Sequence, residues 1–347
     1  MMLSRLLLLA IFSLFMAVGT AQAQMKVHYI NVGQAESILL EFKSAAVLID
    51  AGGENTGDTR DRDHLVGYLN TFFQRRSDLN RTIHSLIVSH PHVDHTRLLM
   101  DVMNNFNVRN LVDGGGNRGS GIRELREARQ FARQRNIPIS MILDSGIGSQ
   151  GFTTEILAQL RNSPSEVDIR FLAGFRACSD ENNDSLTVLV KYKEATFLFS
   201  GDAESDDNTC LAEITHLINR YRNTGLLDVD VYKVGHHGSH NGTTRAFLRA
   251  MSPEISVISA GHHSTREPDD FHAFQFGHPR KRAVDMIEAR TSTNRPTPAT
   301  VYTMSAVRRK TRDRLMRKAV YCTCWDGDIV ISVDETGTQL NVEPSGR

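Results

Sequence analysis

Residues 89–95, with the sequence SHPHVDH, limit the possible folds of this 347-residue chain more than any other segment. Three histidines and one aspartate lie within six residues, directly after the apolar run at residues 86–88, which is typical of a strand. On an extended backbone, His90 and His92 point to the same side, and Asp94 and His95 follow one turn further on. Zinc binds imidazole nitrogens and carboxylate oxygens. The segment therefore predicts a metal site at the end of a strand, and a polar loop with surface histidines is the weaker alternative.

Later strand patterns also end in groups that can bind metals. Residues 197–204, FLFSGDAE, form an apolar strand that ends in Gly-Asp. Residues 229–239, VDVYKVGHHGS, form another strand that ends in a histidine pair, and residues 277–279 are Gly-His-Pro. Together with the HxHxDH segment, they resemble the motifs of the ComEC-type branch of the metallo-β-lactamase superfamily.

Three other segments extend this resemblance over most of the chain. Residues 30–37, INVGQAES, are similar to the family's opening VGQGDA motif, and residues 47–53, VLIDAGG, are similar to its strand ending in DxG. Residues 182–186, NNDSL, resemble the NNxSL step before the Gly-Asp strand. The motifs occur in the family's order between about Met25 and about Val342. The resemblance therefore implies its α/β fold, a four-layer αββα sandwich with a metal centre where strand ends from both halves meet.

The sequence also departs from the family pattern. Thr96 and Arg97 stand where a pair of glycines usually follows Asp-His, so we expect a differently shaped loop. Ala35 and Glu36 stand where Gly-Asp is usual in the opening motif. Residues 262–272 are longer than the corresponding family segment, and we expect them to form a lid.

The resemblance implies that the metal ligands lie at these strand ends. The candidates are His90, His92, Asp94, His95, Asp202, His236 and His237. His90 and His92 would hold the first ion, and Asp94 and His95 would hold the second. Asp202 would bridge the two ions.

One ligand position of the family has no counterpart in this chain. Lactamases and glyoxalases carry a third histidine ligand between the first motif and the bridging aspartate, and this sequence has no histidine there. We expect His236 to replace it, with His237 as the next candidate. His278 would either bind a metal or protonate the leaving group. Asp50 would orient the loop histidines by accepting their remaining N–H.

These expectations describe a binuclear metal-dependent hydrolase whose catalytic residues are Asp94, Asp202 and His278. A hydroxide held by two divalent ions would be its nucleophile. Zinc suits the ligands best, and manganese or iron fit the same groups. Three loop residues are expected to contact the substrate: Ser239, His240 and His263.

The resemblance implies a phosphodiester substrate, including DNA or RNA. Hydrolysis of a smaller ester, as by phosphorylcholine esterases or lactonases, is an alternative that changes the pocket and leaves the metals in place. Another is a binding protein that uses metals only to hold its loops, although Asp202 favours an enzyme. The formal net charge is zero, but residues 280–318 contain twelve Lys or Arg against three Asp or Glu. That stretch fits contact with a phosphate backbone or a solvated surface.

The first residues predict export. Arg5 and the apolar residues 6–15 precede an Ala-Gln-Ala cleavage pattern at residues 21–23. We therefore expect a signal peptide at residues 1–23 and one hydrolase domain at residues 24–347. The mature protein would be periplasmic or secreted, and no later stretch is apolar enough to span a membrane.

An exported chain can form disulfides, and this one has four cysteines. We expect Cys178 to pair with Cys210, because they flank the NNxSL and Gly-Asp segments and a bridge there would brace the metal site. A metal site at the Cys-Thr-Cys of residues 322–324 is less consistent with zinc, since two thiolates do not complete a tetrahedral shell.

Hydrophobic periodicity predicts the secondary structure. Strands are expected at residues 25–32, 37–42, 45–49, 86–88, 186–191, 196–199, 229–234 and 255–259, with strand character again at 320–342. Helices are expected at residues 61–76, 121–135, 204–221 and 243–251. The first three strands should form an antiparallel meander. The alternation of strands and helices implies helices packed outside two facing sheets.

Overall fold

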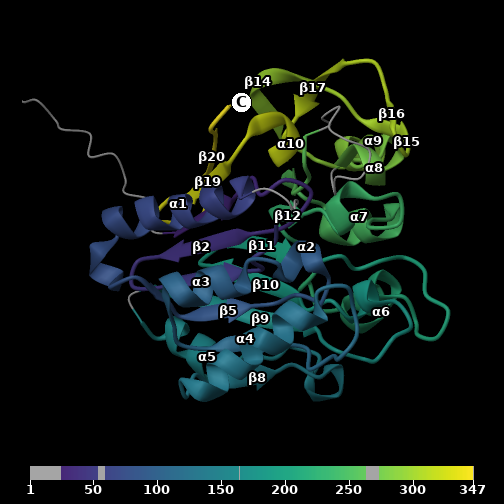
Figure 1. Ribbon diagram of the computed structural model, residues 1–347. Coiled ribbons are helices and arrows are strands. Elements are labelled where there is room, and N and C mark those ends of the chain that lie inside the picture. Colours follow the sequence, from purple (N-terminus) through teal and green to yellow (C-terminus); the bar gives the residue numbers. More distant parts are fainter. Residues whose placement is uncertain (1–24, 54–58, 164, 263–272, 347) are drawn as a thin grey trace, which may run out of the picture.

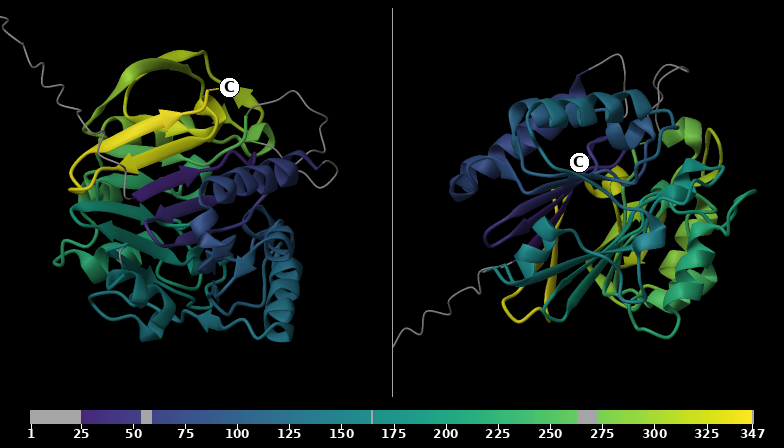
Figure 2. Two further views of the ribbon diagram at one scale, coloured as in Figure 1. Left: turned by 90° about the vertical axis from the view of Figure 1, so that its left-hand side faces the viewer. Right: turned by 90° about the horizontal axis from the view of Figure 1, so that it is seen from below.

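The computed structural model describes residues 25–53, 59–163, 165–262 and 273–346 (Figure 1). The expected signal peptide, most of the expected lid and the candidate His263 lie outside the described residues. In the described part, two β-sheets face each other and helices cover the outer face of each sheet (Figure 2). This arrangement confirms the predicted αββα sandwich.

The first sheet has eight strands in the order β20-β19-β1-β2-β3-β5-β7-β8. They are β1 (Met25–Tyr29), β2 (Ile38–Phe42), β3 (Ala46–Ile49), β5 (Ser85–Ile87), β7 (Leu111–Asp113), β8 (Ile139–Met141), β19 (Ile329–Val333) and β20 (Leu340–Pro344). The strands β1, β2 and β3 form the predicted antiparallel meander, and β3, β5, β7 and β8 run parallel. Parallel neighbours need a crossover connection, which contains α1 (Arg60–Arg75), α3 (Leu99–Asn105) or α4 (Ile122–Gln134).

The second sheet has six strands in the order β18-β13-β12-β11-β10-β9. They are β9 (Val167–Ala173), β10 (Thr187–Tyr192), β11 (Ala195–Phe199), β12 (Val231–Lys233), β13 (Ile255–Ile258) and β18 (Val320–Cys322). The strands β9, β10 and β11 are antiparallel, whereas β11, β12, β13 and β18 are parallel. The parallel crossovers contain α6 (Glu213–Tyr221), α7 (Arg245–Met251) and α9 (Lys281–Glu288).

The alternation of side chains along the strands separates the layers. Val47 and Phe197 belong to the buried cluster between the two sheets. Their neighbours Leu48 and Leu198 point the other way, into the clusters between each sheet and its helices. The central strands, such as β2, β3, β5 and β12, are therefore buried on both faces, which explains their nearly continuous apolar runs in the sequence.

Shorter elements complete the described structure. The helices are α2 (Val93–Thr96), α5 (Glu155–Arg161), α8 (Ala273–Phe276) and α10 (Thr323–Asp326), and the 3₁₀ turns are η1 (Ser77–Leu79), η2 (Asp144–Gly146), η3 (Glu181–Asp184) and η4 (His236–Gly238). The strands are β4 (Thr82–Ile83), β6 (Asn107–Val108), β14 (Asn294–Val301), β15 (Met304–Ala306), β16 (Arg309–Lys310) and β17 (Arg314–Lys318). Among the described residues, no helix has the length and apolar character needed to cross a membrane.

The helix predicted at residues 204–221 is wrong in its first half, because α6 begins only at Glu213. The side chain of Asp207 accepts hydrogen bonds from the backbone N–H groups of Thr209 and Cys210 at 2.7 and 2.8 Å. Such local side-chain bonds stabilise a loop in place of a helix. The hydrophobic patterns of several other segments, including β7, β8, β9 and α9, are too short or too mixed to predict a strand or a helix.

Candidate metal centre

Four strand ends bring the candidate residues to one edge of the sandwich. In the first sheet, Asp50 directly follows β3, and β5 leads into the HxHxDH segment. In the second sheet, β11 leads to Asp202 and β12 leads to the histidine pair. Because β3 and β5 run parallel, as do β11 and β12, their carboxyl ends meet at a common edge of each sheet.

A cluster of four residues forms the centre of the site. One ligand atom from each of Asp94, His95, Asp202 and His237 lies within 4.8 Å of the others. The Nε2 atoms of His95 and His237 are each 3.3 Å from Oδ2 of Asp202, and Nε2 of His237 is 3.2 Å from Oδ2 of Asp94. His95, Asp202 and His237 are buried, so water does not screen these groups.

Hydrogen bonds on the far side of each ring orient the two histidines. Nδ1 of His95 lies 2.7 Å from Oδ2 of Asp50, and Nδ1 of His237 lies 2.8 Å from the carbonyl oxygen of Ser259. Both partners accept, so Nδ1 carries the proton in each ring. The Nε2 lone pairs therefore face the carboxylates of the cluster. Asp50 itself accepts hydrogen bonds from the backbone N–H and the hydroxyl of Ser89, both at 2.7 Å.

The cluster fits a bound cation. Within the described residues, Nε2 of His95, Nε2 of His237 and Oδ1 of Asp202 are buried and have no hydrogen-bond partner. Unpaired buried polar atoms are costly, and the Nε2 lone pair of a neutral ring repels the carboxylate oxygens that it faces, so each Nε2 needs a proton or a cation. A divalent cation removes both penalties because each of these atoms can donate electrons to it.

The electrostatics agree with this geometry. Burial alone lowers the pKa of His95, but the negative charges of Asp202 and Asp50 outweigh it and raise the pKa well above its ordinary value. Burial likewise lowers the pKa of His237, and Asp202 and Asp94 raise it to about 9. The carboxylates thus create a strongly negative potential at both rings, which holds a proton on each Nε2 near pH 7 unless a cation takes its place. The same potential attracts a metal cation.

His90 and His92 lie beside this cluster. The ring of His90 is 4.2 Å from that of His95, and its Nε2 is 3.1 Å from Nδ1 of His92. Burial and the neighbouring histidines lower the pKa of His90 well below its ordinary value. His90 is therefore neutral near pH 7 and keeps a lone pair that can bind a metal.

The two histidines after β12 contact different partners, which the sequence did not indicate. His237 joins the four-residue cluster, whereas His236, the first candidate from sequence, points Nδ1 at Oε1 of Glu204 at 2.7 Å. Both residues have positive φ angles, 47° and 50°, in the tight turn η4. This turn directs the two adjacent rings to different partners, and His237 rather than His236 is placed with Asp94 and Asp202.

His278 occupies the rim of the site. Its ring lies 5.4 Å from that of His236 and 6.3 Å from that of His237. Its Nδ1 is 3.1 Å from Nε2 of Gln34, and Oε1 of Gln34 accepts a hydrogen bond from the N–H of Gly261 at 3.2 Å. Burial lowers the pKa of His278 well below its ordinary value, so the ring is neutral.

Two buried residues below Asp202 were missed as site residues. Lys233 forms an ion pair with Glu36, and its Nζ donates to the carbonyl oxygen of Gly201 at 3.1 Å and lies 3.9 Å from Oδ1 of Asp202. Burial lowers the pKa of Lys233, but the charges of Glu36 and Asp202 outweigh it and raise the pKa. The signal was present in the sequence, because both residues lie inside motifs.

Two glycines are required by close backbone contacts. A Cβ on Gly52 would lie 1.7 Å from the carbonyl oxygen of Asp94. Gly201 has a φ of 52°, and a Cβ there would lie 2.8 Å from the hydroxyl of Ser185, which accepts a hydrogen bond from the N–H of Asp202. Larger residues at either position would displace a carboxylate of the cluster.

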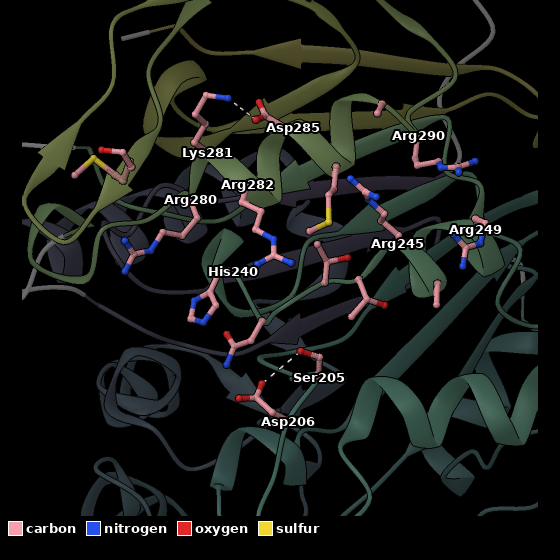
Figure 3. A pocket seen from close by; sticks show the side chains of 18 residues that line it. Ser205, Asp206, His240, Arg245, Arg249, Arg280, Lys281, Arg282, Asp285 and Arg290 are labelled. Carbon is pink, nitrogen blue, oxygen red and sulfur yellow. Dashed lines mark hydrogen bonds and ion pairs between the residues drawn. The ribbon is translucent and has the colours of Figure 1, made fainter.

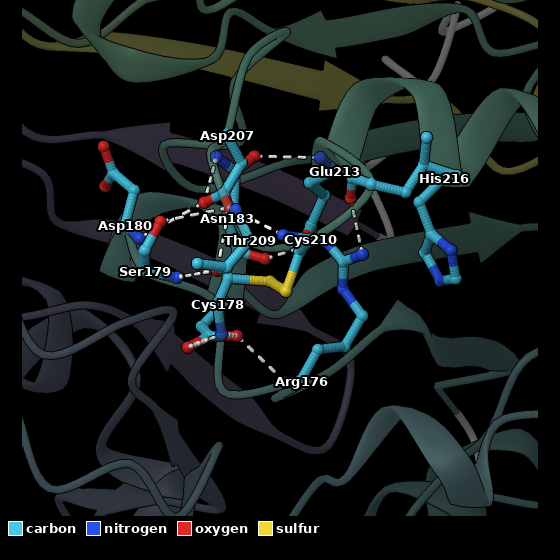
Figure 4. The surroundings of a disulfide bond; sticks show 12 residues. Arg176, Cys178, Ser179, Asp180, Asn183, Asp207, Thr209, Cys210, Glu213 and His216 are labelled. Carbon is cyan, nitrogen blue, oxygen red and sulfur yellow. Dashed lines mark hydrogen bonds and ion pairs between the residues drawn. A yellow bond between two sulfur atoms is a disulfide. The ribbon is translucent and has the colours of Figure 1, made fainter.

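The predicted disulfide between Cys178 and Cys210 is confirmed, with a Cα–Cα distance of 5.3 Å (Figure 4). It joins the loop before η3 to the loop before α6. In η3, the amide of Asn182 donates to Oε1 of Glu204 at 2.8 Å. Since Glu204 contacts His236, the disulfide stabilises loops that support the site. Cys322 and Cys324 form a second disulfide, so they hold no metal.

The residues expected to contact substrate lie beside the site. Ser239 is buried, and its hydroxyl donates to Oδ1 of Asn241 at 2.6 Å. His240 is exposed and lines a large pocket. The third candidate, His263, lies outside the described residues.

This chain belongs to the metallo-beta-lactamase superfamily, whose family model matches residues 30–262. It is 22% identical over 281 residues to ComE operon protein 3 of Bacillus subtilis (strain 168) and 23% identical over 280 residues to Recombination protein 2 of Haemophilus influenzae. These matches cover 76% and 80% of this chain and 30% of each relative. The resemblance to ComEC-like competence proteins is therefore confirmed as distant homology. The chain spans only about a third of the length of each of these relatives.

A similar fold occurs in the metallo-beta-lactamase fold protein YhfI from Bacillus subtilis. The match has a TM-score of 0.43 and 9% sequence identity, and it covers 78% of this chain and 94% of the other.

Proposed function

We propose that this protein is a metal-dependent hydrolase that cleaves phosphodiesters. The observation that carries the proposal is the cluster of Asp94, His95, Asp202 and His237, whose ligand atoms lie within 4.8 Å of one another and include two buried Nε2 atoms without a hydrogen-bond partner. Proteins with the metallo-β-lactamase fold are usually metal-dependent hydrolases, which supports the reaction class.

The chain offers ligands for two divalent cations. One would be held by Asp94, His95 and His237, and the other by His90 and His92, with Asp202 shared between them. Zinc suits these imidazole and carboxylate ligands, and manganese or iron fit them as well. Such a pair of cations supplies positive charge that lowers the pKa of a bound water and polarises a phosphoryl oxygen.

The surrounding residues hold these ligands in position. Asp50 keeps the proton of His95 on Nδ1, so that Nε2 faces inward. Lys233 fixes the backbone of Gly201 and neutralises part of the negative charge beside Asp202. Glu204 orients His236 at the rim, where that ring can contact a substrate.

We assign His278 as a hydrogen-bond donor to the leaving oxygen and not as a metal ligand. The N–H of Gly261 fixes the amide of Gln34, so the NH₂ group of Gln34 faces Nδ1 of His278 and donates to it. In the neutral ring, the proton is then on Nε2. That N–H can donate to the leaving oxygen of an ester, whereas a metal ligand needs a free lone pair at that atom.

An anionic substrate is favoured over a neutral ester such as a lactone. The loops that carry Asp202, His237 and His278 continue into a pocket whose walls carry arginines (Figure 3).

We also propose that the protein is exported to the periplasm or secreted. Its two disulfides support this location, because disulfides persist in oxidising compartments.

Substitution of the cluster tests the proposed function. Asp202→Asn and His237→Ala should each lower turnover of bis-p-nitrophenyl phosphate by at least about 100-fold and reduce bound metal, because each removes a ligand. His64→Ala is the matched control, since this exposed histidine pairs with Asp328 away from the cluster. Elemental analysis and far-ultraviolet circular dichroism accompany the kinetics. Unchanged turnover in a folded Asp202→Asn variant would reject the proposal.

A further inference from the structure

A large basic pocket lies between two helices on the outer face of the second sheet. Its volume is about 1550 Å³, and its walls come from α7, α9, the loop after β11, the loop after η4 and β15 (Figure 3). The helices present one face each to the pocket. Arg245 and Arg249 lie four residues apart on α7, and Arg282 and Met286 lie four residues apart on α9.

The pocket lies directly beside the candidate metal centre. Ser205 follows Asp202 by three residues, His240 follows His237 by three, and Arg280 follows His278 by two, and all three later residues line the pocket. Three residues span at most about 11 Å, so the pocket and the site adjoin. Hydrogen bonds of 3.0 Å from Ser205 N–H to the Asn241 carbonyl and 2.8 Å from Arg280 N–H to the Gly238 carbonyl join these loops.

The charge of the pocket is strongly positive. Six of its lining residues are Arg or Lys and two are Asp, which gives 6 − 2 = +4. Lys281 pairs with Asp285 at 2.5 Å. Among the described residues, no ion pair joins a carboxylate to any of the other five cations, which are Arg245, Arg249, Arg280, Arg282 and Arg290. Clustered like charges repel each other, so a bound anion stabilises this arrangement.

The size and composition of the pocket favour an extended anion. Pockets for small ligands measure about 300–1,000 Å³ and are mostly apolar, whereas this one is larger and most of its lining residues are polar or charged. Arginine binds phosphate through two parallel hydrogen bonds. The described lining residues include no Phe, Tyr or Trp, the large aromatic side chains on which bases stack, and His240 is the one ring among them.

We propose that this pocket binds a run of consecutive phosphates next to the phosphodiester being cleaved, and does so without contacting the bases. The inference rests on the proposed function, since it assigns the substrate as a chain of phosphates such as a nucleic acid strand. Arg282 extends from α9 toward the loop of His240, whereas Arg245, Arg249 and Arg290 gather at the other end (Figure 3). A strand would therefore pass from His240 and Arg282 toward α7.

Binding of an oligonucleotide to the Asp202→Asn variant tests this inference, because it can be measured without hydrolysis. The probe is a fluorescein-labelled oligothymidylate of about 16 nucleotides, followed by fluorescence anisotropy as salt rises. Adding Arg249→Ala and Arg282→Ala should weaken binding at least about tenfold and make the slope of log K against log salt shallower by about 1.4, because two phosphate contacts are lost. Both arginines are exposed, so the variants should fold.

Two comparisons complete the test. Arg133→Ala removes the same charge from an exposed position on α4, in the opposite helix layer, and should change the affinity by less than about twofold. Inorganic polyphosphate should displace the oligothymidylate, because it presents phosphates without bases. The inference is overturned if the Asp202→Asn variant does not bind the oligothymidylate, if the arginine variants keep its affinity and salt slope, or if polyphosphate fails to compete. None of these results depends on hydrolysis of bis-p-nitrophenyl phosphate, which tests the proposed function.

Discussion

At the scale of single residues, a buried ion pair supports the carboxylate at the centre of the site. Glu36 and Lys233 are both fully buried and form an ion pair. Glu36 belongs to the half of the chain that forms the first sheet, and Lys233 belongs to the half that forms the second. Lys233 also donates a hydrogen bond to the backbone carbonyl of Gly201. Glu36 stands where the family's opening motif usually has an aspartate. The longer side chain reaches across the interface between the two sheets to meet Lys233.

Removing one member of this pair should lower the free energy of unfolding much more than removing both. Lys233→Met leaves the Glu36 carboxylate buried without its cation, so we expect the free energy of unfolding to fall by about 3–5 kcal/mol. The double variant Glu36→Gln with Lys233→Met should recover most of that loss, because no charge remains buried. Urea unfolding followed by circular dichroism measures both. Equal losses in the single and double variants would contradict this account.

At the scale of elements, the loop before α6 has its own stabilising contacts. The disulfide, the Asp207 side chain and the Asn182–Glu204 hydrogen bond connect it to η3, which holds the rim residue His236 through Glu204. These contacts explain why residues 204–212 do not join the helix that their pattern predicts.

The two disulfides should differ in their effect on stability. The Cys178–Cys210 bond closes a sequence separation of 32 residues and should contribute about 3–4 kcal/mol, because it restricts the unfolded chain. The Cys322–Cys324 bond spans a separation of 2 and serves as the control. Replacing Cys178 and Cys210 with alanine should therefore lower the melting temperature more than replacing the other pair. The reverse order in calorimetry would refute this expectation.

Much of the fold and of the candidate site could be predicted from sequence, for physical reasons. The strands buried on both faces give long apolar runs, and the ligands follow them directly, so the convergence of Asp94, His95 and Asp202 was foreseen. The different directions of His236 and His237 were not, because they depend on two positive φ angles in η4. The basic stretch was recognised, but the arginines of α7 that complete the pocket lie outside it.

At the scale of the whole molecule, a further ion-pair cluster connects the two halves of the chain. Asp144 lies in η2 after β8 of the first sheet, and it accepts hydrogen bonds from Arg220 of α6 at 2.8 and 2.7 Å. His216 of the same helix lies 3.1 Å from it. Burial raises the pKa of Asp144, but His216 and Arg220 outweigh it and lower the pKa to about 2.

This cluster predicts part of the acid sensitivity. A carboxyl group whose pKa is lowered by folding stabilises the protein above its unfolded pKa, near 3.9, and that stability is lost as the pH falls toward about 2. After allowance for solvent screening, we expect about 1 kcal/mol from Asp144. Asp144→Asn should remove this part of the pH dependence between pH 4 and pH 2 in urea unfolding. An unchanged dependence would assign the acid sensitivity to other carboxylates.

In the proposed function, the clustered histidines and aspartates hold two divalent cations, and these cations make the protein a phosphodiesterase. The most direct measurement is a titration of metal-stripped protein with zinc or manganese while hydrolysis of bis-p-nitrophenyl phosphate is recorded. We predict that activity is absent without metal and rises to a plateau at about two equivalents. Full activity in the stripped protein, or two bound equivalents without any hydrolysis, would contradict this proposal.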